Sequence, residues 1–143
     1  MIRPATAEDA AEIAALYHDI RKDSVPLVHS VHDVAVWIRD VLVIRGTSHV
    51  LDLDGVVGWL DVRDGWVDQL YIRRGRTGQG HGKVLLDMAK EACPTGLRLY
   101  TFQVNEGARR FYAREGFAEI DFGDGAANEE GQPDVLLQWT PSL

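Results

Sequence analysis

A run of alternating glycines offers the clearest chemistry in the sequence. Gly78, Gly80 and Gly82 alternate with Gln79 and His81, and apolar residues at helical spacing follow directly. Glycine permits positive φ angles and lets a ligand approach the backbone closely. The start of a helix presents unpaired N–H groups and the positive end of a dipole, which together bind phosphate. The run is therefore a candidate phosphate cradle.

Two common phosphate-binding motifs do not fit this run. A P-loop requires a glycine, four further residues and then Gly-Lys-Ser/Thr, but here Thr77 occupies the first glycine position and Val84 the hydroxyl position. A dinucleotide fingerprint requires Gly-x-Gly-x-x-Gly, but Lys83 occupies the third glycine position. Three kinds of fold bind phosphate with such a loop. The third, a cradle for the pyrophosphate of an acyl-CoA, remains.

Basic residues gather at the same run, although the chain as a whole is acidic. Arg73, Arg74, Arg76 and Lys83 lie within it or beside it. There they could meet the pyrophosphate and the 3′-phosphate of CoA. A solvated turn with scattered basic residues is the alternative interpretation of the same side chains.

Three segments of the chain are more informative together than the glycine run is alone. They are Leu70-Tyr71-Ile72, Thr77-Gly78-Gln79-Gly80-His81-Gly82 and Asn105-x-x-Ala108-x-x-Phe111-Tyr112-x-x-x-Gly116-Phe117. In combination they resemble the GNAT superfamily of N-acetyltransferases, and the resemblance extends from Ile2 to the last predicted strand. One position departs from the family pattern, because Thr77 stands where Gln or Arg is usual. The loop works mainly through backbone N–H groups, so we expect threonine to be tolerated there.

The resemblance implies that acetyl-CoA is the cosubstrate. It implies that two neighbouring strands splay at a bulge, and that backbone groups near Leu70 and Ile72 hold the pantetheine and polarise the thioester carbonyl. The residues implied to bind the cosubstrate are Leu70, Tyr71, Ile72, Arg76, Thr77, Gly78, Gln79, Gly80, His81, Gly82, Lys83, Asn105, Ala108, Phe111 and Tyr112.

The resemblance also implies a general acid. Tyr112 would protonate the sulfur of the departing CoA, and because phenol and thiol pKa values lie within about two units, this transfer is not steeply uphill. Asn105 would meet the pantetheine or an ordered water. Apart from the motif, Tyr112 would be an aromatic anchor beside Phe111, and Asn105 would be a helix N-cap.

Asp68 is the predicted general base. By the period-two alternation of a strand it lies on the same face as Leu70 and Ile72, close to where the acceptor amine should arrive. A solvent-facing carboxylate, with a water chain as the base, is the alternative. Cys93 could suggest a covalent acetyl-enzyme, but it lies at the far end of the helix that follows the glycine run. We therefore expect direct transfer in a ternary complex.

The acceptor is expected to be a small amine or a peptide amine. The residues predicted to bind it are Tyr17, Arg21, Glu129, Glu130 and Asp134. The acids in this set suit a cationic amine, and they equally suit a solvated loop. His29-x-x-His32 has the spacing of a metal site, but two histidines without a third ligand are usually structural. We therefore expect no metal.

Capping signals and hydrophobic periodicity place these residues on a mixed α/β framework. Helices are predicted over 6–22, 30–41, 84–92 and 105–115, and strands over 2–5, 49–54, 56–62, 66–72, 97–104, 117–122 and 135–139. Asp54-Gly55 is typical of a two-residue hairpin turn, and Arg63-Asp64-Gly65 predicts the next turn. The result is a mixed, mostly antiparallel sheet of about seven strands with four helices. The resemblance implies that its fourth and fifth strands splay.

Composition excludes several classes of protein. A chain of 143 residues, 45% of them hydrophobic and 26% charged, predicts one globular domain over residues 1–143. The net charge of −7 disfavours binding to nucleic acid or to an anionic membrane. One cysteine cannot form an intramolecular disulfide, and no apolar stretch approaches the roughly 18 residues of a membrane span. We expect a cytoplasmic protein, and a homodimer is compatible with the sequence.

Two other functions fit the same sequence. One is an acyl-CoA-binding module without transfer activity. The other is an acyltransferase that uses a longer acyl group.

Overall fold

A seven-stranded sheet organises the computed structural model of the chain, which describes residues 1–141. The strands follow one another across it in the order β1 (Ile2–Pro4), β2 (Ser48–Asp52), β3 (Val56–Arg63), β4 (Trp66–Ile72), β5 (Leu97–Phe102), β7 (Asp134–Trp139) and β6 (Phe117–Gly123). β4 and β5 are parallel, and the other neighbours are antiparallel. Ser142 and Leu143, the last residues of the predicted domain, lie outside the described residues.

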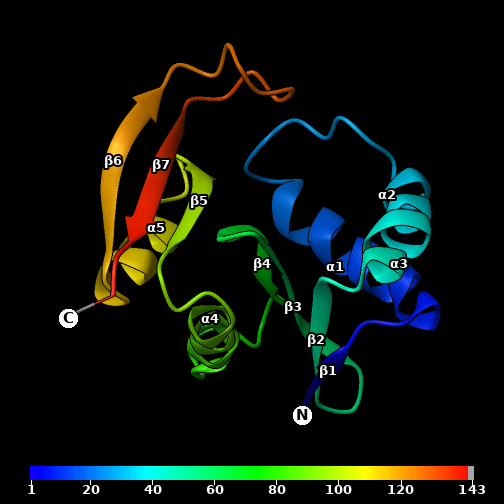
Figure 1. Cartoon of the computed structure of the whole chain (residues 1–143). Coiled ribbons are helices and arrows are strands. Elements are labelled where there is room, and N and C mark those ends of the chain that lie inside the picture. The colour runs from blue at the N-terminus through cyan, green and yellow to red at the C-terminus, as the bar shows by residue number, and fades with distance from the viewer. Residues whose placement is uncertain (142–143) are drawn as a thin grey trace.

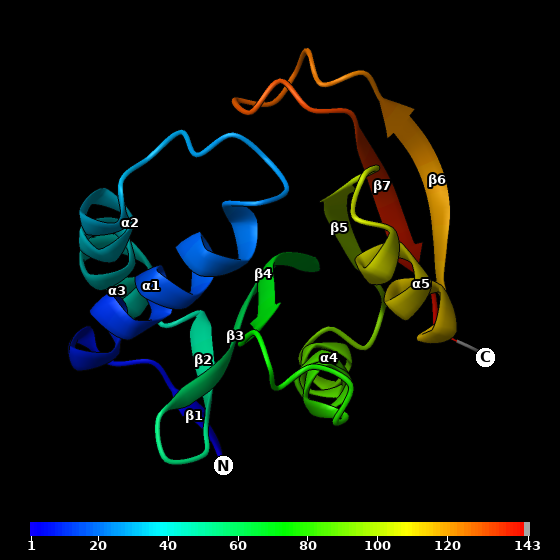
Figure 2. The ribbon, with the colours of Figure 1, turned by 180° about the vertical axis from the view of Figure 1, so that it is seen from behind.

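Helices cover both faces of this sheet. Their bounds are α1 (Ala10–Arg21), α2 (Val31–Trp37), α3 (Val43–Arg45), α4 (His81–Ala92) and α5 (Glu106–Arg114). Figures 1 and 2 show α1, α2 and α3 beside the β1 to β4 half of the sheet, with α4 and α5 on the other face. The predicted fold class is confirmed. The sheet separates two hydrophobic clusters, one on each face.

A charged cluster fixes the start of the first helix. The Thr6 N–H donates to Asp9 Oδ2 at 2.8 Å, as in a capping box, and one short 3₁₀ turn (Ala7–Asp9) precedes α1. Asp9 also accepts from the Arg3 guanidinium of β1 at 2.8 and 2.9 Å. Arg3 in turn donates to Asp52 of β2 at 3.1 Å. The cluster joins the edge of the sheet to α1.

The second helix is longer than predicted. It begins as expected, because Ser30 Oγ accepts the Asp33 N–H at 3.0 Å. It does not end near Val41, since a π-helical segment (Ile38–Leu42) leads from α2 directly into α3. Gly46, with φ of +78°, closes it.

The first hairpin also differs from the prediction. Three residues, 53–55, connect β2 and β3, and the register shifts between Leu51 and Asp52. The reason is an Asp52 side chain that accepts the Gly55 N–H at 3.0 Å and shapes a wider loop than a two-residue turn. The second turn, Asp64-Gly65, has positive φ angles of 53° and 83°, as a tight hairpin turn requires.

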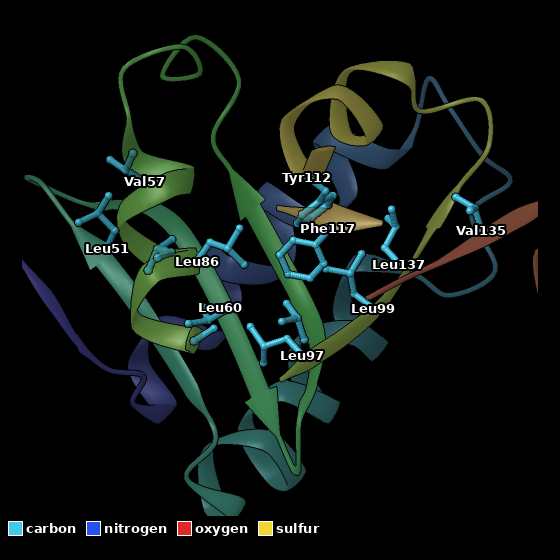
Figure 3. Close-up of a cluster of buried hydrophobic side chains, with 13 residues drawn as sticks. Leu51, Val57, Leu60, Leu86, Leu97, Leu99, Tyr112, Phe117, Val135 and Leu137 are labelled. Carbon is cyan, nitrogen blue, oxygen red and sulfur yellow. The ribbon is translucent and has the colours of Figure 1, made fainter. Parts of the chain in front are cut away.

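The larger hydrophobic cluster lies between the sheet and the two helices α4 and α5. Figure 3 shows Leu60 and Leu86 meeting Leu97, Leu99 and the aromatic rings beside them. The smaller cluster, built on Trp59 with Ile13 and Ile38, lies beneath α1 and α2. The larger cluster contains residues of both halves of the sheet and joins them beside the gap where β4 and β5 separate, whereas the smaller cluster belongs to the β1 to β4 half.

Candidate active site

The sheet opens between its two parallel strands. β4 and β5 pair only at Trp66 and Arg98, where the Arg98 N–H donates to the Gly65 carbonyl at 2.8 Å. Beyond this point the strands diverge (Figure 1). A cleft of about 1190 Å³ occupies the opening and is lined from both strands, from α1, α4 and α5, and from the β6–β7 connection. The predicted splay is thus present.

Backbone groups of β4 face this opening without a strand partner. The Arg73 N–H donates to the Val57 carbonyl at 2.7 Å, toward β3. Backbone groups in a strand alternate in direction, so those of Leu70 and Ile72 point toward the edge that β5 has left. Both residues line the cleft, and their side chains pack against the larger cluster. The edge offers hydrogen bonds to an extended ligand.

Asp68 does not lie where the sequence placed it. Asp61 pairs with Gln69, and Val62 pairs with Val67, so Asp68 is the extra residue of a β-bulge. The bulge breaks the alternation of the strand. The Asp68 carboxylate therefore turns to Arg63, 3.6 Å away, on the face opposite to Leu70 and Ile72.

Asp68 nevertheless lines the cleft. About a third of its side chain (34%) is exposed. Partial burial raises the pKa of this carboxyl group, and the nearby Arg63 opposes the shift. A carboxylate with a raised pKa in a cleft is suited to accepting a proton.

The glycine run forms an open loop at the start of α4. Gly78 and Gly80 have φ angles of +74° and +85°, and no heavy atom lies within 4 Å of a Cβ built on either. The space beside both backbones is free for a ligand. Gly82 has a different role, because a Cβ there would lie 3.3 Å from Cζ of Phe111, where α4 meets α5.

The basic residues around the loop are not equivalent. Arg73 donates to Glu12 at 3.0 Å and to the Val56 carbonyl, and Arg74 lies 3.3 Å from Asp19 and 3.2 Å from Asp23. Neither lines the cleft, so the structure does not bring these two side chains to the predicted cosubstrate site. Ion pairs with Glu12, Asp19 and Asp23 hold both side chains away from the cleft.

Arg76 and Lys83 do line the cleft. Lys83 is shared between Asp87 and Glu115, each at 3.2 Å. The buried Nε of Arg76 has no hydrogen-bond partner among residues 1–141. A buried guanidinium N–H without a partner calls for an acceptor. Together with the open glycine loop, it fits a phosphate group of acetyl-CoA.

Tyr112 lines the cleft from α5. Its side chain is 7% exposed and packs edge-on against Phe111 and Phe117, at centroid distances of 5.1 and 5.4 Å. No residue among 1–141 accepts from or donates to the hydroxyl. Burial, with a smaller contribution from Tyr71, raises the pKa of Tyr112. The phenol is therefore protonated at neutral pH, and its proton is given up less readily than the unshifted pKa values suggest.

Asn105 caps the helix that carries Tyr112. Its Oδ1 accepts the Ala108 N–H at 3.2 Å, and the residue lines the cleft. The N-cap role is thus present. Phe111 and Ala108, one helical turn apart, line the cleft as well.

The predicted acceptor residues divide between two places. Arg21, Glu130 and Asp134 line the main cleft. Tyr17 and Glu129 line a small neighbouring pocket of about 20 Å³, where Glu129 lies 3.2 Å from His29.

An ion pair joins α1 to the loop between the last two strands. Arg21 lies 3.3 Å from Glu130, and the side chains are only 14% and 12% exposed. The Arg21 guanidinium also donates to the Tyr17 hydroxyl and lies 5.5 Å from the Phe102 ring centroid. These contacts bound one end of the cleft.

Most of the predicted cosubstrate residues line the cleft, including Thr77, Gly78, Gly80, His81 and Tyr71. Gln79 does not, and its side chain bonds to His81 at 3.1 Å. Sequence reasoning missed Tyr100, Phe102, Arg114 and Asp121, which also line the cleft. Strand alternation could have found the aromatic pair, and helical spacing from Phe111 could have found Arg114.

Within residues 1–141 no group of three His, Cys, Asp or Glu side chains is arranged to hold a metal ion. No helix among these residues is both long and apolar enough to cross a bilayer.

Known structures share this architecture along almost their whole length. The apo-form of YjaB from Escherichia coli has a TM-score of 0.78 at 22% identity, covering 99% of this chain and 98% of that one. An N-acetyltransferase from Staphylococcus aureus has a TM-score of 0.79 at 17% identity, covering 96% and 99%. YncA from Salmonella typhimurium, a putative acetyltransferase solved with its cofactor acetyl-CoA, has a TM-score of 0.76 at 18% identity, covering 100% and 94%. At these identities the likeness concerns the fold.

The family is shown by the sequence itself. No relative is found among curated protein sequences. The family model of the acetyltransferase (GNAT) domain, however, matches residues 34–119, which is more than half of the chain. The match includes the bulged strand, the glycine loop and the helix of Tyr112. The chain therefore belongs to the GNAT acetyltransferase family.

Proposed function

We propose that this protein is an acetyl-CoA-dependent N-acetyltransferase that acts on a primary amine by direct transfer. The observation that carries the proposal is the continuous cleft from the open glycine loop, along the unpaired edge of β4, to Tyr112, whose ring is buried and which lines the cleft. YncA, a structure of the same fold, was solved with acetyl-CoA. Membership of the GNAT family supports the same cosubstrate.

The chain's own groups would hold the cosubstrate at three points. Backbone N–H groups of the loop around Gly78 and Gly80, together with Arg76, bind the pyrophosphate. The unpaired backbone groups of Leu70 and Ile72 hold the pantetheine in an extended form. Bound acetyl-CoA supplies the acetyl group as an activated thioester.

Two side chains carry out the proton transfers of the reaction. Asp68 takes a proton from the acceptor nitrogen, since its raised pKa makes the carboxylate a stronger base. Tyr112 donates its hydroxyl proton to the departing sulfur. The two groups reach the cleft from opposite faces of the sheet, Asp68 from the bulge of β4 and Tyr112 from α5. Acceptor and cosubstrate can thus enter from different sides.

A covalent acetyl-enzyme is not part of this proposal. Cys93 follows the last residue of α4, at the end opposite to the glycine loop. It does not line the cleft. Direct attack in a ternary complex needs no protein nucleophile.

Calorimetric titration with acetyl-CoA, followed by a thiol-release assay over a panel of amines, tests the proposal. We expect binding together with amine-dependent release of CoA. Binding without release from any amine would support a CoA-binding module. Release only with a longer acyl-CoA would identify a different acyltransferase, and failure to bind would contradict the cradle.

Arg76→Gln gives a sharper test of the cradle. We expect CoA affinity to fall about tenfold, the effect of losing one charge-assisted bond to a phosphate. Arg74→Gln is the matched control, because Arg74 lies on the same loop but is held by Asp19 and Asp23 outside the cleft. Equal losses in both variants would show a general charge effect instead.

A further inference from the structure

Charge is divided between the two faces of the cleft. The lining residues on the α4 and α5 side include Arg76, Lys83 and Arg114, with Glu115 as the acid among them. The lining residues on the other side include Asp68, Asp121, Glu130 and Asp134, with Arg21 as the base among them. The first side suits the phosphates of the proposed cosubstrate. The second side has an excess of negative charge that the reaction does not explain.

Strand register fixes the side on which these acids lie. Leu136 pairs with Tyr100 on one neighbour and with Asp121 on the other. Val135 and Leu137, on either side of Leu136, are fully buried against the α4 and α5 cluster. Alternation therefore turns Tyr100, Leu136 and Asp121 to the opposite face.

Asp134 and Phe102 pair with each other and lie on this same face, two residues further along their strands. We call the cleft-lining part of this face, residues Asp68, Tyr100, Phe102, Asp121 and Asp134, the acidic face.

The carboxylates of the acidic face are poorly neutralised. Glu130, at its margin, is already paired with Arg21. Asp68 has only the 3.6 Å contact with Arg63, whose side chain is 48% exposed. Asp121 and Asp134 form no ion pair within the described part of the chain, although Asp134 accepts from Asn128 at 3.3 Å. The cleft therefore holds negative charge available to a ligand.

An aromatic wall stands beside these carboxylates. Tyr100 is 59% exposed, and its ring stacks on Trp66 at a centroid distance of 5.7 Å with an interplanar angle of 12°. The Phe102 ring already has the Arg21 guanidinium 5.5 Å from its centroid. An aromatic face between carboxylates attracts an organic cation more strongly than it attracts a neutral group.

The reacting nitrogen cannot be the cation that this face binds. An amine attacks a thioester only as the neutral base, so a charge on that nitrogen must be removed before transfer. Negative charge around it would raise its pKa and oppose that step. The acidic face is better explained by a second positive charge on the same acceptor, at a distance from the reacting nitrogen.

We infer that the acceptor is a diamine-type compound, with a second ammonium group joined to the reacting amine by a flexible apolar chain. Asp121 and Asp134 bind the second ammonium beside Tyr100, while the reacting nitrogen lies near Asp68 and the cosubstrate thioester. This inference rests on the proposed function for the identity of the reaction. The preference for a second positive charge concerns binding and can be measured without the reaction. Tyr112, 7% exposed and with no hydrogen bond from its hydroxyl among residues 1–141, lines the same cleft from the α5 side.

Three acceptors of equal length separate the contribution of the second charge. Pentane-1,5-diamine, pentylamine and 5-aminopentanoate carry a positive, neutral and negative group at the far end. Each is titrated calorimetrically into the free protein and into the protein saturated with CoA, and each is then tested for thiol release with acetyl-CoA. We expect the diamine to bind at least about tenfold more tightly than pentylamine, with 5-aminopentanoate weakest. The preference should shrink in high salt.

Single substitutions locate the second charge. Asp121→Asn and Asp134→Asn should each lower the diamine preference about three- to tenfold, because they weaken diamine binding more than pentylamine binding. Asp124→Asn is the control, because it removes the same charge. Asp124 is exposed on the connection between β6 and β7 and does not line the cleft.

The outcomes separate this inference from the proposed function. Equal binding of diamine and pentylamine would overturn the inference, as would tightest binding of 5-aminopentanoate, which would assign Arg21 to a carboxylate. If CoA binds but no amine causes thiol release, the proposed function fails while the titrations still decide the inference. If CoA does not bind, titration of the free protein still compares the three acceptors.

Discussion

Tyr112 is the residue whose surroundings most specifically suit a chemical role. A buried phenol usually donates its hydrogen bond to a protein acceptor, because an unpaired buried hydroxyl costs about 1–3 kcal/mol. Here the ring is held by Phe111 and Phe117, while the hydroxyl reaches the cleft without a partner among residues 1–141. Packing thus fixes the ring, and the hydroxyl is left available to a ligand.

Replacement of Tyr112 by phenylalanine tests this role directly. The aromatic contacts remain, so we expect a thermal midpoint and CoA affinity close to those of the wild type. Thiol release should fall about 100-fold, within the range of general acid catalysis. Tyr100→Phe is the control and should leave turnover nearly unchanged, because its exposed ring keeps its stacking on Trp66. Equal turnover in the Tyr112 variant would remove it from the mechanism.

Sequence patterns identified individual residues where a local rule governs them. The glycine run and the cap at Asn105 depend on positive φ and on side-chain hydrogen bonds between near neighbours, so their positions could be predicted. Asp68 could not be placed correctly, because the bulge arises from pairing with β3, which is not visible within the strand's own sequence. The ion pair of Arg21 with Glu130 joins residues 109 positions apart and has no local signal.

The loop between β4 and α4 shows how one element serves both fold and ligand. Its glycines differ in what they face. Gly75 and Gly80 have nearly equal φ angles of +87° and +85°, and neither has a heavy atom within 4 Å of a built Cβ. Only Gly80 lines the cleft. The two positions therefore separate backbone strain from obstruction of a ligand.

A pair of valine substitutions uses this difference. Gly75→Val and Gly80→Val should each destabilise the fold by roughly 1–3 kcal/mol, since a β-branched residue is strained at positive φ. Only Gly80→Val should also weaken CoA binding, by about tenfold or more, because its side chain enters the cradle. Thermal unfolding and calorimetry measure the two effects separately. Similar CoA affinities in the two variants would contradict the cradle.

The junction of β1, β2 and α1 predicts a dependence of stability on pH. The Arg3 guanidinium, followed by the Thr6 cap, lowers the pKa of Asp9 from 3.8 to about 2. A lowered folded-state pKa means that the carboxylate stabilises the fold above about pH 4, and that this contribution disappears as the pH falls toward 2.

Asp9→Asn should therefore cost about 2 kcal/mol of unfolding free energy at pH 7, with the difference from wild type shrinking between pH 4 and pH 2. Urea titrations at several pH values measure it. Asp64→Asn, in an exposed turn that asparagine also favours, should show little difference at any pH. A constant deficit of Asp9→Asn across this range would mean that packing, not charge, is responsible.

The bounds of helices and strands were predictable where capping residues mark them. They were less predictable where no capping or turn residue marks the end of the element. Ser30 correctly indicated the start of α2. Its end was predicted too early, because the π-helical segment shifts the hydrophobic spacing beyond Trp37. The hairpin at Asp54-Gly55 was assigned too few residues, because the Asp52 side chain takes part in the turn.

At the scale of the whole molecule, the two halves of the sheet meet across a single pair of residues. Trp66 and Arg98 pair at one end of β4 and β5, while the hydrophobic cluster under α4 and α5 spans both halves (Figure 3). The rest of the β4 edge carries backbone groups without a strand partner. A ligand lying along that edge would replace the missing strand.

This arrangement predicts where ligand binding slows amide exchange. With saturating CoA, we expect the segment 67–72 to exchange more slowly, and its outward-facing N–H groups, those of Leu70 and Ile72, to slow about tenfold, since they gain hydrogen bonds that β5 does not supply. The β2 segment Ser48–Asp52 is an internal control, because it already pairs with strands on both sides. Hydrogen–deuterium exchange with peptide-level detection compares the two segments in one sample. Equal slowing in both would indicate general stabilisation by mass action. Slowing confined to β4 would show that the separated strands are the place where the ligand completes the sheet.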